Sequence, residues 1–248
     1  MEELPCVSIL TATYKRAHFN ALMIYNVRNY HYPKDKLEWI IYDDSPEPHK
    51  QFKNNEEVLE AQKICGVKIR YIFDNSRHLS IGEKRNKLTK LAKYKLCINQ
   101  DTDDIYQPQY IKYSVDMLKS KKNVGLVGSP QMIFLFPNKD WKMTFIECPA
   151  ERQIHEGTML YTKKYWKSMG GFATKGTGEG AKMIDFSENR CLKTECKEQM
   201  VCLAHGSNTC NKDLFSEDKD SIYQLESKPN QFIKDLISNC LADEFIIV

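Results

Sequence analysis

The chain has 248 residues, and 36 lysines and arginines against 33 aspartates and glutamates give it a net charge of +3. This excess is too small for a protein held on nucleic acid by phosphate contacts, and a hydrophobic share of 42% excludes a disordered or fibrous chain. No run approaches the roughly 18–20 apolar residues that span a bilayer, and the acidic start does not resemble a secretory signal. We therefore expect a globular cytoplasmic protein, in the host cytoplasm if the source is viral.

The nine cysteines are irregularly spaced, and four of them cluster between Cys191 and Cys210. The chain has no CxxC pair, and the spacings within the cluster match no common zinc module. Zinc binding and disulfides remain alternatives at this point. We expect reduced thiols that pack as small hydrophobic side chains.

The first hundred residues alternate apolar segments with amphipathic ones. In chain order, the pattern predicts a strand over 6–11, a helix over 19–30, a strand over 37–42, a helix over 56–63, a strand over 67–73, a helix over 82–92 and a strand over 95–99. This alternation is typical of an α/β protein with an open, mainly parallel sheet and helices on both faces. Ligands bind at the carboxyl ends of such strands, where two of these strands lead into acidic residues.

The second half is less regular. The pattern predicts strands over 123–129, 131–136, 143–147 and 157–161, a short helix over 165–169, a loop over 173–182 and a terminal helix over 232–241. No linker, repeat or low-complexity segment divides the chain, so we expect one domain over 1–248.

Acidic residues follow two of the predicted strands. In the segment Asp101-Thr102-Asp103-Asp104, carboxylates at alternate positions can converge on Mg²⁺ or Mn²⁺, which prefer oxygen ligands. Asp43 and Asp44 can accept hydrogen bonds from a ribose or a base. The alternative for both segments is a solvated turn or a helix cap.

The polar segment 11–16 follows the first strand. Its Tyr14 could stack on a base, and its Arg16 could pair with a phosphate. No G-x-G-x-x-G follows this strand, which disfavours a dinucleotide site. The glycine-rich stretch 176–182 lacks the residues around Lys182 that a phosphate-binding P-loop needs.

Five motifs in order resemble the family 2 glycosyltransferases, which have the GT-A fold. They are T-A-T-Y-K-R (11–16), W-I-I-Y-D-D-S (39–45), G-E-K-R-N (82–86), D-T-D-D (101–104) and G-G-F (170–172), and the resemblance covers about 6–186. It implies metal-dependent, inverting transfer of a sugar from a nucleotide diphosphate sugar, expected to be a UDP-sugar, to a hydroxyl of a glycan, protein or small molecule. It divides the domain into a nucleotide-sugar half (about 1–105), an acceptor and catalytic half (about 106–211) and a tail (about 212–248). The oligomeric state stays open.

The resemblance also assigns residues. The expected nucleotide-sugar contacts are Thr11, Thr13, Tyr14, Arg16, Asp43, Asp44, Arg77, Lys84, Arg85, Asp101 and Thr102. The expected ligands for Mn²⁺ or Mg²⁺ are Asp101, Asp103 and His205, with Asp103 as the direct ligand.

One departure from the family pattern concerns the general base. Members commonly carry Glu-Asp after G-G-F, with Asp as the base, whereas this chain has Glu179-Gly180. We expect Glu179 to be the base and Asp185 to be second; the alternative for Asp185 is a helix-start cap or a salt-bridged surface group. The missing Asp favours a rival reading as a non-catalytic sugar- or nucleotide-sugar-binding module, which the intact D-T-D-D opposes. A sugar nucleotidyltransferase is disfavoured because the first loop has no glycine.

Overall fold

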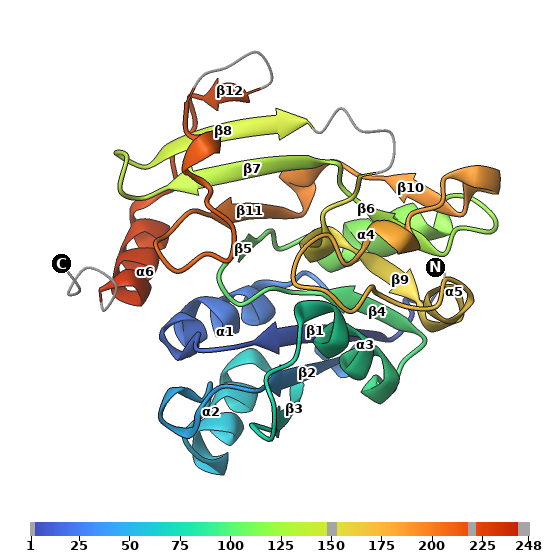
Figure 1. Ribbon diagram of the computed structural model, residues 1–248, viewed down its shortest axis with the longest axis horizontal. Helices are drawn as coiled ribbons and strands as arrows, with labels where there is room; N and C mark the ends of the chain where they lie inside the picture. The colour runs from blue at the N-terminus through green and yellow to red at the C-terminus, as the bar shows by residue number, and fades with distance from the viewer. Residues whose placement is uncertain (1–2, 148–152, 218–221, 243–248) are drawn as a thin grey trace.

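The computed structural model describes residues 3–147, 153–217 and 222–242, and its larger sheet has seven strands (Figure 1). Their order is β10-β6-β9-β4-β1-β2-β3, and β9 alone runs antiparallel to its neighbours. The bounds are β1 Val7–Thr13, β2 Leu37–Asp43, β3 Lys68–Phe73, β4 Leu96–Asn99, β6 Leu126–Gly128, β9 Leu160–Thr162 and β10 Cys191–Lys193. The prediction of a mainly parallel α/β sheet is confirmed.

Helices cover both faces of this sheet because side chains alternate along its strands. Ile9 and Trp39 pack in the same core as helices α1 (Asn20–Asn29), α2 (Asn55–Cys65) and α4 (Tyr110–Lys119). Leu10 and Ile40, one residue further along, pack in a second core with α3 (Ile81–Leu91) and α5 (Lys163–Ser168). Both cores are fully buried at these strand positions, so β1 and β2 are fixed in register and direction.

Local signals explain why α3 begins where it does. Ser80 and Glu83 form a capping box, in which each side chain bonds the backbone N–H of the other residue. The helix therefore starts immediately after the extended segment that follows β3. Its second turn carries Lys84 and Arg85, which are buried at the sheet edge.

The second sheet was not predicted from the sequence. It has the order β12-β8-β7-β11-β5 and lies at the opposite end of the view from β2 and β3 (Figure 1). Its bounds are β5 Ile105–Tyr106, β7 Gln131–Phe136, β8 Lys142–Glu147, β11 Met200–Leu203 and β12 Ile222–Leu225. Helix α4 was also missed, and the strand expected over 157–161 begins only at Leu160, after a 3-10 turn over Glu156–Thr158. A second 3-10 turn, over Ala181–Met183, begins inside the predicted loop, whereas the predicted terminal helix is α6, Gln231–Leu241.

The described cysteines are all free, and most of them are buried. This agrees with reduced thiols in hydrophobic surroundings; Cys148 lies outside the described residues. Across the described ranges, no helix combines the length and apolar character needed to cross a bilayer.

Candidate functional site

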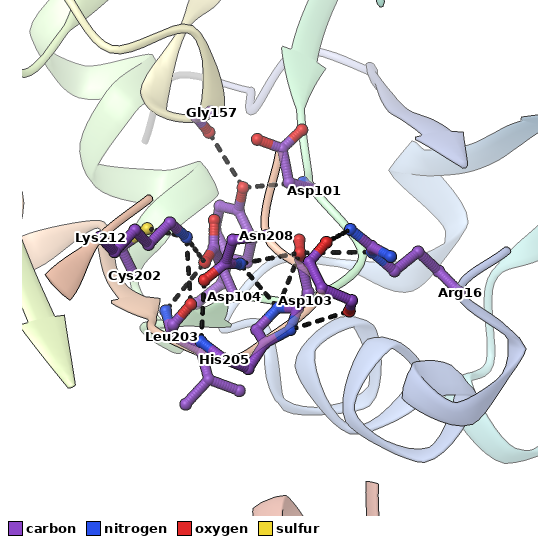
Figure 2. A network of polar contacts seen from close by, with 12 residues as sticks. Arg16, Asp101, Asp103, Asp104, Gly157, Cys202, Leu203, His205, Asn208 and Lys212 are labelled. Atoms are coloured by element: carbon purple, nitrogen blue, oxygen red, sulfur yellow. Dashed lines mark hydrogen bonds and ion pairs between the residues drawn. The ribbon is translucent and has the colours of Figure 1, made fainter. Parts of the chain in front are cut away.

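The D-T-D-D segment leaves β4 at the carboxyl edge of the sheet, and its carboxylates separate toward different partners (Figure 2). Asp101 meets Arg85, Asp103 meets Arg16 and His205, and Asp104 turns inward. Two distinct polar clusters result, each with one acid of the motif.

The first cluster comprises Arg16, Asp103, His205 and Asn208, and we call it the Asp103 cluster. His205 Nε2 lies 3.0 Å from Asp103 Oδ2, and Arg16 Nε lies 3.5 Å from the same oxygen. Arg16 also donates a hydrogen bond to the carbonyl of Ser207, next to Asn208. Burial opposes ionisation of Asp103, but the His205 hydrogen bond and the Lys212 and Arg16 charges outweigh it and hold the pKa of Asp103 below its usual range.

Asp104 connects the motif to the second sheet instead. Its carboxylate accepts a hydrogen bond of 3.0 Å from the Leu203 N–H at the end of β11, and Lys212 Nζ lies 4.0 Å away. Burial raises the pKa of Asp104 to about 6, although the Lys212 charge opposes this. Asp104 thus joins the loop after β4 to the strand that delivers His205.

The second cluster comprises Arg85, Asp101, Glu156 and Glu179, and we call it the Arg85 cluster. Arg85 Nε donates to Glu179 Oε1 at 2.9 Å, and Nη2 donates to Asp101 Oδ1 at 3.0 Å. Arg85 is 4% exposed; burial opposes its charge, but the charges of Asp101 and Glu179 outweigh this and raise its pKa. One guanidinium therefore faces three carboxylates.

Glu156 is the member of this cluster that the sequence reasoning missed. It lies in the 3-10 turn before β9, and its Oε1 accepts a hydrogen bond of 3.0 Å from the Gly180 N–H. Burial, and then the charge of Glu179, raise the pKa of Glu156. The segment E-G-T-M-L-Y (156–161) belongs to the family resemblance, but the resemblance assigned no role to its glutamate; the available signal was the glycine at 180, where the family pattern predicts an acid.

Tyr14, Asp44 and Lys84 lie together beyond the ends of β1 and β2. Lys84 forms an ion pair with Asp44, donates to the Thr13 carbonyl at 3.0 Å and lies 5.2 Å from the Tyr14 ring centre. Burial lowers the pKa of Lys84, and Asp44 opposes that effect. Asp44 also contacts His78, whose ring centre is 4.1 Å from that of Tyr14. The structure thus brings together four of the residues predicted to contact the nucleotide: Thr13, Tyr14, Asp44 and Lys84.

Other predicted residues point inward. Asp43 accepts hydrogen bonds from the backbone N–H groups of Ser45 and Gln51 and from the Tyr71 hydroxyl. Thr11 is completely buried and accepts a hydrogen bond from the Trp39 indole. Asp43 thus fixes the end of β2, and Thr11 joins β1 to β2 within the sheet.

Three predicted residues lie apart from the two clusters. Arg77 is exposed and pairs with Glu83, and Thr102 is buried within the motif loop. Asp185 binds the Ser187 N–H at 2.9 Å and pairs with Arg190 at 2.7 Å. The structure does not bring Asp185 into the group of carboxylates around Arg85.

The donor set of the Asp103 cluster fits a divalent cation. A carboxylate oxygen and an imidazole nitrogen 3.0 Å apart can bind the same ion, and Mg²⁺-type sites commonly use one or two protein ligands with substrate phosphates and water. In the described part of the chain, no three His, Cys, Asp or Glu side chains are arranged to hold a metal. An ion held by Asp103 and His205 would complete its coordination with substrate phosphate and water.

Comparisons with known proteins identify the family and the fold. The model of "Glycosyl transferase family 2" matches residues 8–181, and no curated protein matches the chain. A mannosyltransferase from Pyrobaculum calidifontis, solved with GDP-Man and Mn²⁺, has a TM-score of 0.62 and 14% identity over 99% of this chain and 76% of that one.

A second similar protein is TarS from S. aureus, of which the chain covers a smaller share in the two structures compared. A TarS fragment with UDP gives a TM-score of 0.59 and 12% identity over 80% of this chain and 60% of that one. A longer TarS structure gives 0.53 and 13% identity, and the chain spans 37% of its length. At these identities the likeness establishes the fold, and the match to the family model covers most of the sequence. The chain therefore belongs to glycosyl transferase family 2 and has the GT-A fold.

Proposed function

We propose that this chain is a metal-dependent, inverting glycosyltransferase that moves a sugar from a nucleotide diphosphate sugar to a hydroxyl group. The observation that carries the proposal is the Asp103 cluster, where Arg16 and His205 converge on one acid of D-T-D-D. Related structures hold UDP, UDP-GlcNAc or GDP-Man, and we propose a UDP-sugar as the donor. The acceptor would be a glycan, a protein or a small molecule.

Each group of residues has a role in this proposal. Tyr14 would stack on the base, Asp44 would accept a hydrogen bond from the ribose or base, and Arg16 and Lys84 would face the diphosphate. Asp103 and His205 would hold Mn²⁺ or Mg²⁺. Such an ion, when bound, neutralises the charge that develops on the leaving diphosphate.

The sequence leaves a second candidate, a nucleotide-sugar-binding module without catalysis. Gly180 favours it, because the family pattern predicts a catalytic aspartate there. The two functions differ in one measurement, since only an enzyme releases nucleoside diphosphate from the bound donor.

Thermal unfolding with and without Mn²⁺ tests the proposal against UDP-glucose, UDP-galactose, UDP-GlcNAc and GDP-mannose. A donor at 100 times its dissociation constant stabilises the native state by about 2.7 kcal/mol, a readily measured shift. We expect a Mn²⁺-dependent shift with one donor, followed by slow release of its nucleoside diphosphate. No shift with any donor contradicts the function, and a shift without release supports the binding module.

A further inference from the structure

The side chain of Glu156 occupies the space beside Gly180. A Cβ built on Gly180 would lie 2.7 Å from Glu156 Cγ and 3.1 Å from Glu156 Oε1. The backbone at Gly180 is ordinary right-handed helical, with φ −79° and ψ −15°, so any residue could adopt it. What excludes a larger residue is the neighbouring side chains, those of Glu156 and Met159.

Among the three carboxylates of the Arg85 cluster, Glu156 is the one for which the described contacts include no hydrogen bond from Arg85. Glu179 and Asp101 both accept hydrogen bonds from Arg85. For Glu156, the described contacts include a bond from the Gly180 N–H and none from Arg85. Its pKa is raised, as expected for a carboxylate held in a buried site beside another acid. A base that works near neutral pH benefits from such a shift.

We propose that Glu156 is the carboxylate that accepts the proton of the attacking hydroxyl, delivered from the turn before β9 to the place where the family resemblance predicts an aspartate at 180. The assignment rests on the proposed glycosyltransferase function. The hydroxyl O–H bond breaks and its proton goes to Glu156 as the oxygen bonds to the sugar C1. The bond from C1 to the diphosphate oxygen breaks at the same time, and its electron pair leaves with the diphosphate.

Glu179 then has a positioning role in this assignment. It accepts a hydrogen bond from Arg85, and its charge and that of Arg85 act on Glu156 in opposite directions. These two groups come from the loop before residue 180 and from α3, and Arg85 is also paired with Asp101 at the end of β4. Any pH dependence of Glu156 therefore includes their influence.

The first test is Glu156→Gln, which keeps the size of the side chain and an acceptor for the Gly180 N–H. The assay measures nucleoside diphosphate release, with water as the acceptor, from whichever of UDP-glucose, UDP-galactose, UDP-GlcNAc or GDP-mannose gives the largest thermal shift. We expect the shift with Mn²⁺ to be retained and release to fall about 100- to 10,000-fold. The matched variant Asp116→Asn, at an exposed ion pair with Lys112, should release at the wild-type rate. Release by Glu156→Gln within threefold of wild type overturns the assignment.

The second test moves the carboxylate from position 156 to position 180, where the family pattern has it. Glu156→Ala removes the base and one of the two side chains that crowd position 180; the other contact is with the terminal methyl of Met159, the far end of a flexible side chain. Adding Gly180→Asp then places an acid on a backbone that accepts it. We expect the double variant to release at least tenfold faster than Glu156→Ala, with a pH profile displaced from that of wild type. A double variant that shows the donor shift yet is no faster than Glu156→Ala overturns the assignment.

The wild-type measurement separates this inference from the function on which it rests. If wild type gives no donor-dependent shift, the glycosyltransferase proposal fails and this assignment fails with it. If wild type binds and releases, and either variant test fails, the assignment alone is overturned.

Discussion

The two clusters at the sheet edge each take one acid of D-T-D-D, yet they have opposite charge balance. The Asp103 cluster sets a single carboxylate against a guanidinium and an imidazole. The Arg85 cluster sets three carboxylates against one buried guanidinium. The first arrangement suits a metal ion and an anionic diphosphate, and the second suits a group that must accept a proton. A motif that reads as one unit in the sequence thus serves two chemically different places.

Removal of the Arg85 guanidinium, which three carboxylates face, should have the largest effect on the balance between the two clusters. Arg85→Met leaves Asp101, Glu156 and Glu179 together without their cation, and we expect the free energy of unfolding to fall by about 3–5 kcal/mol. Urea unfolding measures the change. Arg77→Met, at an exposed position, should change stability by no more than about 0.5 kcal/mol. A loss below 1 kcal/mol for Arg85→Met would contradict the view that it neutralises the cluster.

A change confined to the Asp103 cluster should affect metal dependence. Asp103→Asn keeps the size of the side chain but removes the charge that His205 and Arg16 contact. We expect the Mn²⁺-dependent part of the donor thermal shift to disappear and diphosphate release to fall at least about 100-fold, in line with electrostatic contributions to catalysis. Full metal-dependent release would remove Asp103 from the metal site.

His205→Gln probes the other ligand of the same cluster. We expect the Mn²⁺ concentration for half-maximal release to rise by at least about tenfold. Metal affinity falls by this much even when a residue that only hydrogen-bonds to a ligand is changed. Titration of Mn²⁺ at saturating donor measures it. An unchanged midpoint would leave Asp103 as the protein's only ligand at this place.

The Arg85 cluster should couple activity to stability through pH. Because the pKa of Glu156 is raised in the folded chain, its stabilising contribution is present below its unfolded pKa and is lost as pH rises through the folded one. Release needs the ionised form, so activity should rise over the same interval. In thermal melts from pH 4 to 8, Glu156→Gln should gain stability relative to wild type as pH increases. A constant difference across the series would argue against a raised pKa.

The smallest effect is expected outside both clusters. Asp185→Asn weakens a partly exposed pair with Arg190, and we expect only a small loss of stability because exposed ion pairs contribute little. Release should stay at the wild-type rate. If the variant binds the donor normally but no longer releases nucleoside diphosphate, Asp185 would again be a candidate for the general base.

The sequence predicted the first hundred residues well because predominantly apolar strand segments alternate there with helical ones. Strands β1 and β2 are buried along almost all of their length, as strands covered on both faces must be. The second half failed where elements are short: β10, β11 and β12 have three or four residues, too few for any alternation to be visible. Helix α4 was missed although Tyr110, Ile111, Val115 and Leu118 share one buried face.

Site residues that belong to a recognised family pattern could be predicted from the sequence. Residues placed in the site by tertiary packing could not. Asp103 and His205 were both selected in advance, and they are in contact. Glu156 lies in a segment that resembles the family but was given no role, and its place depends on the turn that brings it beside Gly180. Asp43 and Asp44 differ by one position, yet only Asp44 contacts Lys84, because side chains alternate at a strand end.

The pairing of β5 with β11 has a consequence for the order of folding. β5 follows the D-T-D-D segment directly, but its partner strand and His205 come about a hundred residues later. Strands β1–β4 and the helices between them all lie within the first hundred residues, whereas β11 and His205 come only from residue 200 onward. During synthesis the sheet of β1–β4 can therefore form while the Asp103 cluster is still incomplete. A nascent chain that ends before residue 200 would carry every acid of the motif and still lack the imidazole, so metal affinity would report completion of the fold.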